Sequence, residues 1–305
     1  MDKLMLDQAE GLRRLLTRAG SRVVAVAGGP AGIGCTSVAV NLGAALSMHG
    51  KDVLVIDEQQ DAGSVSRMLG GSDALALAAV MSGRRALADA VERTPFGFSL
   101  IAAPRDERIS HDAAQCRALL DGPADIVLID AQLDRNGALS TLAAQAHDFL
   151  IVTRVAASAI TEAYACMKRL HYAHAIGQFR VLINHVQNPA DAAVAFDNLS
   201  GVASRYLAVS LVQAGYVSED ARVARAKELS RCAVEAFPAT AAARDYRAIA
   251  AELLHWPMRP APYVRVASGP ADARIPVGDS EQGGRETAHR AAALHDFAMS
   301  STASM

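Results

Sequence analysis

Apolar residues along this chain follow two patterns: continuous runs of about five residues, and longer stretches in which they recur every three or four positions. The runs are rich in valine and isoleucine and several end in aspartate or asparagine, which is typical of strands buried on both faces of a sheet. The spaced pattern is typical of amphipathic helices. The expected strands are 23–27, 52–57, 98–102, 125–130, 149–153, 179–184 and one within 209–220.

Helical spacing occupies the stretches between these runs. The expected helices are 3–19, one that follows the first strand and a glycine-rich turn and ends near 47, two short ones within 73–94, and then 156–170, 190–206, 222–236 and 239–254. Alternating strands and helices predict an α/β fold with a mostly parallel central sheet and helices on both faces. We expect an N-terminal helix at 1–20 and one domain at 21–256. Residues 257–305 carry five prolines and almost no apolar periodicity, which predicts a disordered tail.

Composition narrows the class of protein. A chain of 305 residues with 51% hydrophobic residues is long enough for one large domain plus appendages. The net charge of -2 gives no basic excess, so general nucleic-acid binding is not expected. The four cysteines form no C-x-x-C pair, which disfavours a zinc site and indicates reduced thiols. The chain has neither a signal-peptide pattern nor an apolar run near the roughly 20 residues that span a bilayer. We therefore expect a cytoplasmic protein.

The glycine-rich turn carries the main chemical motif. Residues 29–36, GPAGIGCT, have the length and the ends of the phosphate-binding pattern G-x-x-x-x-G-K-[ST], with Cys35 at the lysine position. Glycines let backbone N–H groups face a phosphate, and the start of a helix adds positive partial charge. Thr36 or Ser37 could offer a hydroxyl to magnesium, but cysteine supplies no cation. The expected nucleotide-binding residues of the loop are Gly29, Gly32, Ile33, Gly34, Cys35, Thr36 and Ser37.

Two of the apolar runs end in aspartate. Because parallel strands present ligand groups at their carboxyl ends, Asp57 and Asp130 should lie beside the loop. Asp130 matches the Walker B carboxylate that holds magnesium opposite the loop hydroxyl. The expected magnesium site is therefore Thr36, Asp57 and Asp130.

The loop and the later segments, over about 23–254, resemble the MinD/ParA class of P-loop ATPases, whose loop reads K-G-G-x-G-K-T. In that alignment Pro30 and Cys35 occupy the two lysine positions. Gln59 occupies the place of the second aspartate of I-D-x-D, which positions the attacking water, and Asp57 the place of the first. An amide can orient a water but cannot act as a base. The resemblance implies ATP or ADP with Mg²⁺, a nucleotide-dependent homodimer, and weak or absent hydrolysis. Replacement cations offered by the sequence are Lys51, Arg154 or an arginine of a partner.

Two further residues carry open alternatives. The strand at 179–184 resembles the one whose final asparagine reads adenine in that class, so Asn184 is a candidate base-binding residue. Its alternative role is to cap the turn before Pro189, and the sequence supports both equally. Cys35 is either an inert thiol or a redox-sensitive one, since a helix N-terminus stabilises a thiolate.

The N-terminal stretch DQAEGLR is similar to the D-Q-A-x-x-L-R element of the FlhG (FleN, YlxH) branch of the class. In that branch the element contacts the GTPase FlhF and stimulates its hydrolysis. The resemblance implies that Asp7, Gln8, Ala9, Leu12 and Arg13 bind such a partner. Helical spacing alone favours a simpler alternative, in which the helix packs on its own domain.

Three functional hypotheses follow. The first is an FlhG-like regulator of flagellar number or placement, cytoplasmic or peripheral at the inner membrane or cell pole. The second is a catalytically inactive pseudo-ATPase scaffold of the same fold. The third is a ParA- or MinD-like partitioning or cell-division ATPase, which the N-terminal element disfavours. Residues 286–299 could form a short helix, but its few basic residues predict weak or no direct membrane binding.

Overall fold

The computed structural model describes residues 20–29, 32–60, 63–69, 76–103, 112–121 and 124–259. The chain divides into two units, Met1–Val264 and Arg265–Met305, and the second lies wholly outside the described residues. The expected helix at 3–19 and nearly all of the expected tail also lie outside them. In the part of the chain that is described, no helix is long and apolar enough to cross a membrane.

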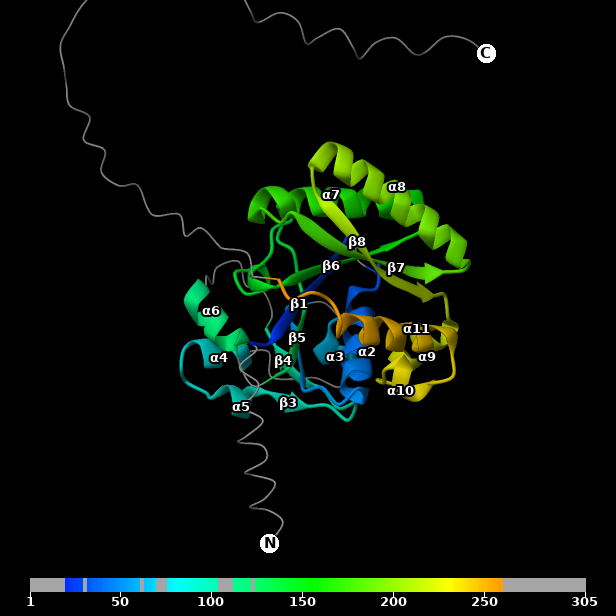
Figure 1. Cartoon of the computed structure of the whole chain (residues 1–305). Coiled ribbons are helices and arrows are strands. Elements are labelled where there is room, and N and C mark those ends of the chain that lie inside the picture. Colours follow the sequence, from blue (N-terminus) through cyan, green and yellow to red (C-terminus); the bar gives the residue numbers. More distant parts are fainter. Residues whose placement is uncertain are drawn as a thin grey trace, which may run out of the picture. The chain divides into compact units, whose positions relative to one another are not determined.

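The described residues form an eight-stranded sheet at the centre of the domain (Figure 1). The strand order is β3-β4-β2-β5-β1-β6-β7-β8, and every pairing is parallel except that of β3 with β4. This confirms the expected mostly parallel α/β fold. The strands are β1 (Arg22–Gly28), β2 (Val53–Asp57), β3 (Glu92–Arg93), β4 (Ser99–Ala102), β5 (Ile126–Asp130), β6 (Asp148–Arg154), β7 (Gln178–Val186) and β8 (Ser210–Ser218).

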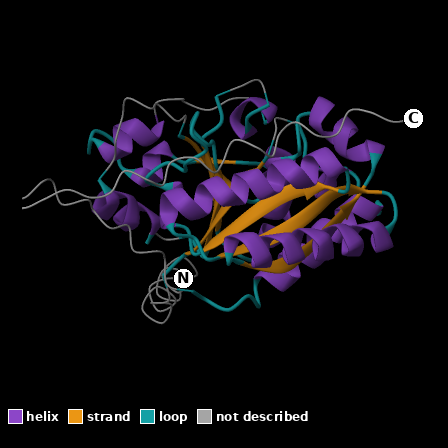
Figure 2. Ribbon diagram, turned by 90° about the horizontal axis from the view of Figure 1, so that it is seen from above, coloured by secondary structure: helices purple, strands orange, loops and turns teal. Residues whose placement is uncertain are grey.

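Helices cover both faces of the sheet (Figure 2). Alternate residues of a strand point to opposite faces, so Val24 and Val26 of β1 pack with α2, α3, α10 and α11, whereas Val23 and Ala25 pack with α4, α6, α7 and α8. The helices are α2 (Cys35–Met48), α3 (Val65–Met68), α4 (Ala76–Met81), α5 (Leu87–Ala90), α6 (Ala113–Leu120), the 3₁₀ turn η1 (Ala143–Gln145), α7 (Ala157–His174), α8 (Pro189–Leu207), α9 (Ala221–Glu228), α10 (Ala233–Ala236) and α11 (Ala241–Leu253).

One expected helix is wrong in its extent. The stretch 222–236 is not continuous, because α9 ends at Glu228 and α10 begins at Ala233. Between them Ser230 has a φ of 53°, a left-handed conformation that no α-helix contains. The break separates α9 from α10 and leaves α9 beside the loop that follows β8.

Strand register brings the site residues together. Asp57 pairs with Asp130 across β2 and β5, and Asp130 pairs with Val26 of β1 on its other side. All three strands run in the same direction, so their carboxyl ends meet at one edge of the sheet. The turn from β1 into α2 lies at that edge.

Candidate functional site

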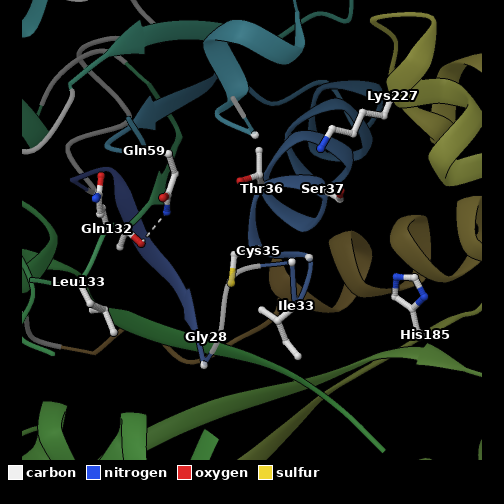
Figure 3. A pocket seen from close by; sticks show the side chains of 15 residues that line it. Gly28, Ile33, Cys35, Thr36, Ser37, Gln59, Gln132, Leu133, His185 and Lys227 are labelled. Carbon is white, nitrogen blue, oxygen red and sulfur yellow. Dashed lines mark hydrogen bonds between the residues drawn. The ribbon is translucent and has the colours of Figure 1, made fainter. Parts of the chain in front are cut away.

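A pocket of about 400 Å³ opens where β1 turns into α2 (Figure 3). This volume lies within the range of small-ligand pockets, roughly 300–1,000 Å³. The wall is built from the glycine-rich loop, from the segments that follow β2 and β5, and from two side chains of the chain's later half. Its described lining residues are 28–29, 32–37, Gln59, Gly63, 131–133, His185 and Lys227.

Close backbone approach explains the glycines of the loop. A Cβ on Gly34 would lie 2.2 Å from Asn184 Nδ2, and Gly34 has a φ of 112° that L side chains rarely adopt. A Cβ on Gly28 would lie 2.7 Å from Cys35 Sγ. Gly34 is the residue before α2 and has no side chain that could accept hydrogen bonds from the first N–H groups of the helix. The first turn of α2 also carries no acidic residue. The backbone N–H groups at the start of α2 therefore give this part of the pocket wall a positive partial charge.

Thr36, which lines the pocket, forms a polar pair with Asp130, which is fully buried and is not itself a lining residue. Thr36 Oγ1 donates to Asp130 Oδ2 at 2.7 Å, so the hydroxyl and the carboxylate that the sequence analysis assigned to a magnesium site lie side by side. The second oxygen, Asp130 Oδ1, is buried and has no hydrogen-bond partner among the described residues. Burial raises the pKa of Asp130 to about 7, the hydrogen bond from Thr36 opposes this rise, and the nearby Asp57 and Glu58 add to it.

The pair fits a magnesium ion. An unpartnered carboxylate oxygen beside a hydroxyl oxygen is the donor set that Mg²⁺ takes in phosphate-binding loops, often through water. No group of three or more histidine, cysteine, aspartate or glutamate side chains in the described ranges could hold a metal by itself. The ion would therefore depend on the oxygens of a bound phosphate.

Asp57 is buried and is not among the residues that line the pocket. Its Oδ2 accepts hydrogen bonds from the backbone N–H of Ser66 at 2.7 Å and from Ser66 Oγ at 2.6 Å, and its Oδ1 accepts one from the backbone N–H of Gln59 at 3.2 Å. Burial raises the pKa of Asp57, and these hydrogen bonds oppose the rise. Asp57 thus fixes the start of α3 and the segment after β2. Its expected catalytic and metal roles stay predictions.

Gln59 lines the pocket, as expected of a residue that orients water. Its Nε2 donates to the carbonyl oxygen of Ala131 at 3.1 Å, across the gap between the segments after β2 and β5 (Figure 3). This contact holds the amide in one orientation. The carbonyl oxygen of Gln59 is then the group that could accept a hydrogen bond from a water.

Asn184 lies beneath the loop. Only 4% of its surface is exposed, its Nδ2 donates to the carbonyl oxygen of Ile33 at 3.0 Å, and its Oδ1 accepts from the backbone N–H of His185. It supports the loop from below and is not among the residues that line the pocket. The alternative that Asn184 caps the turn before Pro189 is wrong, because Asn188 is the cap of α8 and accepts from the backbone N–H of Ala190.

Cys35 lines the pocket as a neutral thiol. Burial raises its pKa well above its usual value, and the nearby Asp130 carboxylate raises it further. The effect of the helix N-terminus is thus outweighed, and the structure favours the inert alternative over a redox-sensitive thiolate. Cys35 takes the place of the expected lysine with no charge.

The structure shows where the two candidate replacement cations, Lys51 and Arg154, lie relative to the pocket. Lys51 is exposed and follows the far end of α2, so it lies away from the pocket. Arg154 ends β6, and its Nη2 donates to the carbonyl oxygen of Gly32 at 2.6 Å, so it supports the loop without being a lining residue of the pocket. Lys227 of α9 lines the pocket and was not predicted from the sequence. No local motif marks it, since about 190 residues separate it from the loop.

The expected partner-binding residues Asp7, Gln8, Ala9, Leu12 and Arg13 lie outside the described residues. Gly29, Gly32, Ile33, Thr36 and Ser37 line the pocket as expected, together with Gly34 and Cys35. His185, which has a φ of 56°, was not expected there. Burial lowers the pKa of His185, and Arg154 lowers it further.

Comparison with known proteins agrees with this geometry. The CobQ/CobB/MinD/ParA nucleotide binding domain matches residues 24–231. The chain is 31% identical over 245 residues to the antiactivator FleN of Pseudomonas aeruginosa, covering 78% of this chain and 88% of FleN.

Solved structures share the fold. The cell division ATPase MinD of Pyrococcus furiosus superposes with a TM-score of 0.59 at 22% identity, covering 77% of this chain and 99% of MinD. MinD of Pyrococcus horikoshii, solved with Mg-ADP, gives a TM-score of 0.58 at 22% identity, with coverage of 76% and 96%. Together with the phosphate loop at the carboxyl edge of the sheet, these matches establish that the chain belongs to the CobQ/CobB/MinD/ParA family of nucleotide-binding domains.

Proposed function

We propose that this chain is an FlhG-like regulator of flagellar number or placement that uses ATP or ADP with Mg²⁺ as a control ligand. The observation that carries the proposal is a glycine-rich turn into α2 beside the Thr36–Asp130 pair, in a sequence in which neither signature lysine is present. Its similarity to FleN, an antiactivator by name, supports the regulatory part.

Binding and turnover place different demands on this site. The uncapped start of α2 offers roughly 0.3–1 kcal/mol to a bound phosphate, and up to about 2 kcal/mol where partly buried. Thr36 and Asp130 would hold Mg²⁺, which neutralises the oxygens of the β- and γ-phosphates when bound. Catalysis of phosphoryl transfer rests on positioned charge, and the loop supplies no cation to the γ-phosphate. The site therefore favours binding over hydrolysis.

Gln59 limits hydrolysis as well. Its amide nitrogen is engaged by Ala131, and its carbonyl oxygen can orient a water but cannot take a proton from it. No carboxylate is among the described residues that line the pocket. Turnover would be slow or absent, and the nucleotide would act through its bound state.

The partner-binding part of the proposal rests on the N-terminal element. Residues 7–13 would act on an FlhF-like GTPase, in the cytoplasm or at the inner membrane of the cell pole. A nucleotide-dependent homodimer would present two such elements.

The test has two arms. Titration calorimetry of Mg-ATP and Mg-ADP into the purified protein should detect binding, and Cys35→Lys should tighten ATP binding more than ADP binding because the new ammonium reaches the β- and γ-phosphates. In the second arm, the full chain should raise the GTPase rate of an FlhF-like protein, and Gln8→Ala should reduce that effect. Absence of stimulation by a folded chain would refute the regulatory proposal.

A pseudo-ATPase scaffold that binds no nucleotide is the second candidate. The replacement of both signature lysines, by Pro30 and Cys35, favours it, since the loop then supplies no cation to a phosphate. Retained GTPase stimulation with no nucleotide binding, even after Cys35→Lys, would select this candidate. A partitioning or cell-division ATPase would instead hydrolyse ATP, and measurable turnover by the wild-type protein would favour it.

A further inference from the structure

The pocket contains one charged side chain among its described lining residues, and it does not come from the loop. Lys227 lies in the last turn of α9, and its side chain extends toward Ser37 at the start of α2 (Figure 3). The other described lining residues carry no permanent charge. A polyanion entering this pocket would therefore meet Lys227 as its nearest fixed cation.

Neighbouring charges leave Lys227 available for a ligand. Arg225 Nη1 pairs with Glu228 Oε2 at 2.7 Å on the same helix, and Arg222 lies over the ring of Phe237. Lys227 forms no ion pair with a described residue. A lysine that pairs with no described carboxylate can attract an incoming phosphate.

Lys227 and the two glutamines lie on different sides of the start of α2. Gln59 and Gln132 lie on one side of Thr36 and Ser37, and Lys227 lies on the other (Figure 3). Mg²⁺ held beside the Thr36 hydroxyl would contact the β- and γ-phosphates of a triphosphate. Lys227 therefore approaches the phosphate-binding start of α2 from the side opposite the glutamines.

We propose that Lys227 replaces the missing loop lysine by binding the phosphate chain of ADP or ATP. This inference rests on the proposed nucleotide binding and names the cation that supports it. A conventional loop lysine reaches the β- and γ-phosphates from within the loop, whereas Lys227 reaches the phosphates from α9.

The experiment compares Lys227→Met with Arg225→Met, a control that removes one positive charge from the same helix outside the pocket. Competition against a fluorescent adenine nucleotide gives dissociation constants for Mg-ADP and Mg-ATP in each variant. Lys227→Met should weaken both about tenfold, the lower end of the loss expected for a hydrogen bond to a charged group. Arg225→Met should leave both unchanged. Added salt should narrow the difference between wild type and Lys227→Met, because screening weakens an exposed charge.

The outcomes separate this inference from the function on which it rests. If the wild-type protein binds neither nucleotide, the proposed nucleotide binding fails and the inference fails with it. If the wild-type protein binds and Lys227→Met binds equally well, only the inference is overturned. A loss confined to ATP would still support Lys227 as the replacement cation and would place it at the γ-phosphate.

Discussion

His147 joins the segment before β6 to the start of β1 through two hydrogen bonds. Its Nδ1 accepts from the backbone N–H of Val23 at 3.0 Å, and its own backbone N–H donates to the carbonyl oxygen of Val23 at 2.9 Å. Burial lowers the pKa of His147, while the adjacent Asp148 opposes this shift. The neutral ring is therefore the form that the fold requires, because a protonated Nδ1 cannot accept.

The stability of the domain should depend on pH through this ring. The folded pKa lies below the unfolded value of about 6.5, so between the two values the unfolded chain binds more protons and the free energy of unfolding rises with pH. The contribution is complete above about pH 6.5 and is lost as the pH falls toward the folded pKa. His147→Asn keeps an acceptor near Nδ1 and does not titrate, so its urea unfolding should vary less between pH 5 and 7. The same substitution at exposed His49 is the control, and parallel pH profiles for wild type and His147→Asn would contradict the argument.

Single residues also show what the sequence could reveal about the site. Thr36 and Asp130 were predictable because each is the last position of a local pattern, a glycine loop and an apolar strand. Lys227 and Arg154 were harder, since their positions depend on how α9 and β6 pack against the loop. The support given by Asn184 to Ile33 depends on a contact between residues 151 positions apart, which no spacing rule contains.

At the scale of elements, α7 and α8 end in the same unusual way. Ala175 and Ala208 follow these helices in the left-handed conformation, with φ of 54° and 53°. Glycine is the usual residue there, because a Cβ is strained at positive φ. Alanine at these two positions therefore lowers the free energy of unfolding of the domain.

Ala208→Gly should therefore raise the free energy of unfolding by about 0.5–1 kcal/mol, because it removes the strain of a left-handed alanine, roughly 1–2 kcal/mol, and adds a smaller entropy to the unfolded chain. The matched control is Ala193→Gly, at an exposed position inside α8, which should lower it by about 1 kcal/mol. Chemical denaturation measures both. Destabilisation by Ala208→Gly would show that the end of α8 tolerates alanine without strain.

Elements with a long regular pattern were predictable from the sequence, and short ones were not. The helices α7, α8 and α11 agree with the predicted ranges to within a few residues, because each buries one apolar face over three turns or more. Helices α3 and α6 have four and eight residues and were missed, since so few positions cannot establish a period. The single helix predicted at 222–236 was wrong because Ser230 adopts a left-handed conformation, which a serine in the sequence does not indicate.

At the scale of the whole molecule, the segment after α11 is held by an ion-pair cluster at the edge of the sheet opposite the pocket. Asp148 accepts from Arg22 Nη1 and from Arg180 Nε, each at 2.9 Å, and all three side chains are largely buried. The guanidinium of Arg180 lies 3.8 Å from the centre of the Trp256 ring, and Arg22 donates to the carbonyl oxygen of Trp256. Trp256 thus joins the end of α11 to Arg22 of β1 and Arg180 of β7, and we predict that the folded domain needs the chain as far as this residue.

Two truncations test that boundary. A chain that ends at Arg259 keeps Trp256 and its contacts, so its thermal midpoint should stay within about 1 °C of the full chain. A chain that ends at His255 loses a ring that is 8% exposed and leaves the buried arginines with fewer partners. It should lose about 3 kcal/mol, the lower end for removal of a buried tryptophan, which corresponds to about 6–12 °C for a domain of this size. Trp256→Ala in the full chain should reproduce most of this loss. A large fall for the chain ending at Arg259 would instead mean that residues 260–305 contribute to the stability of the domain.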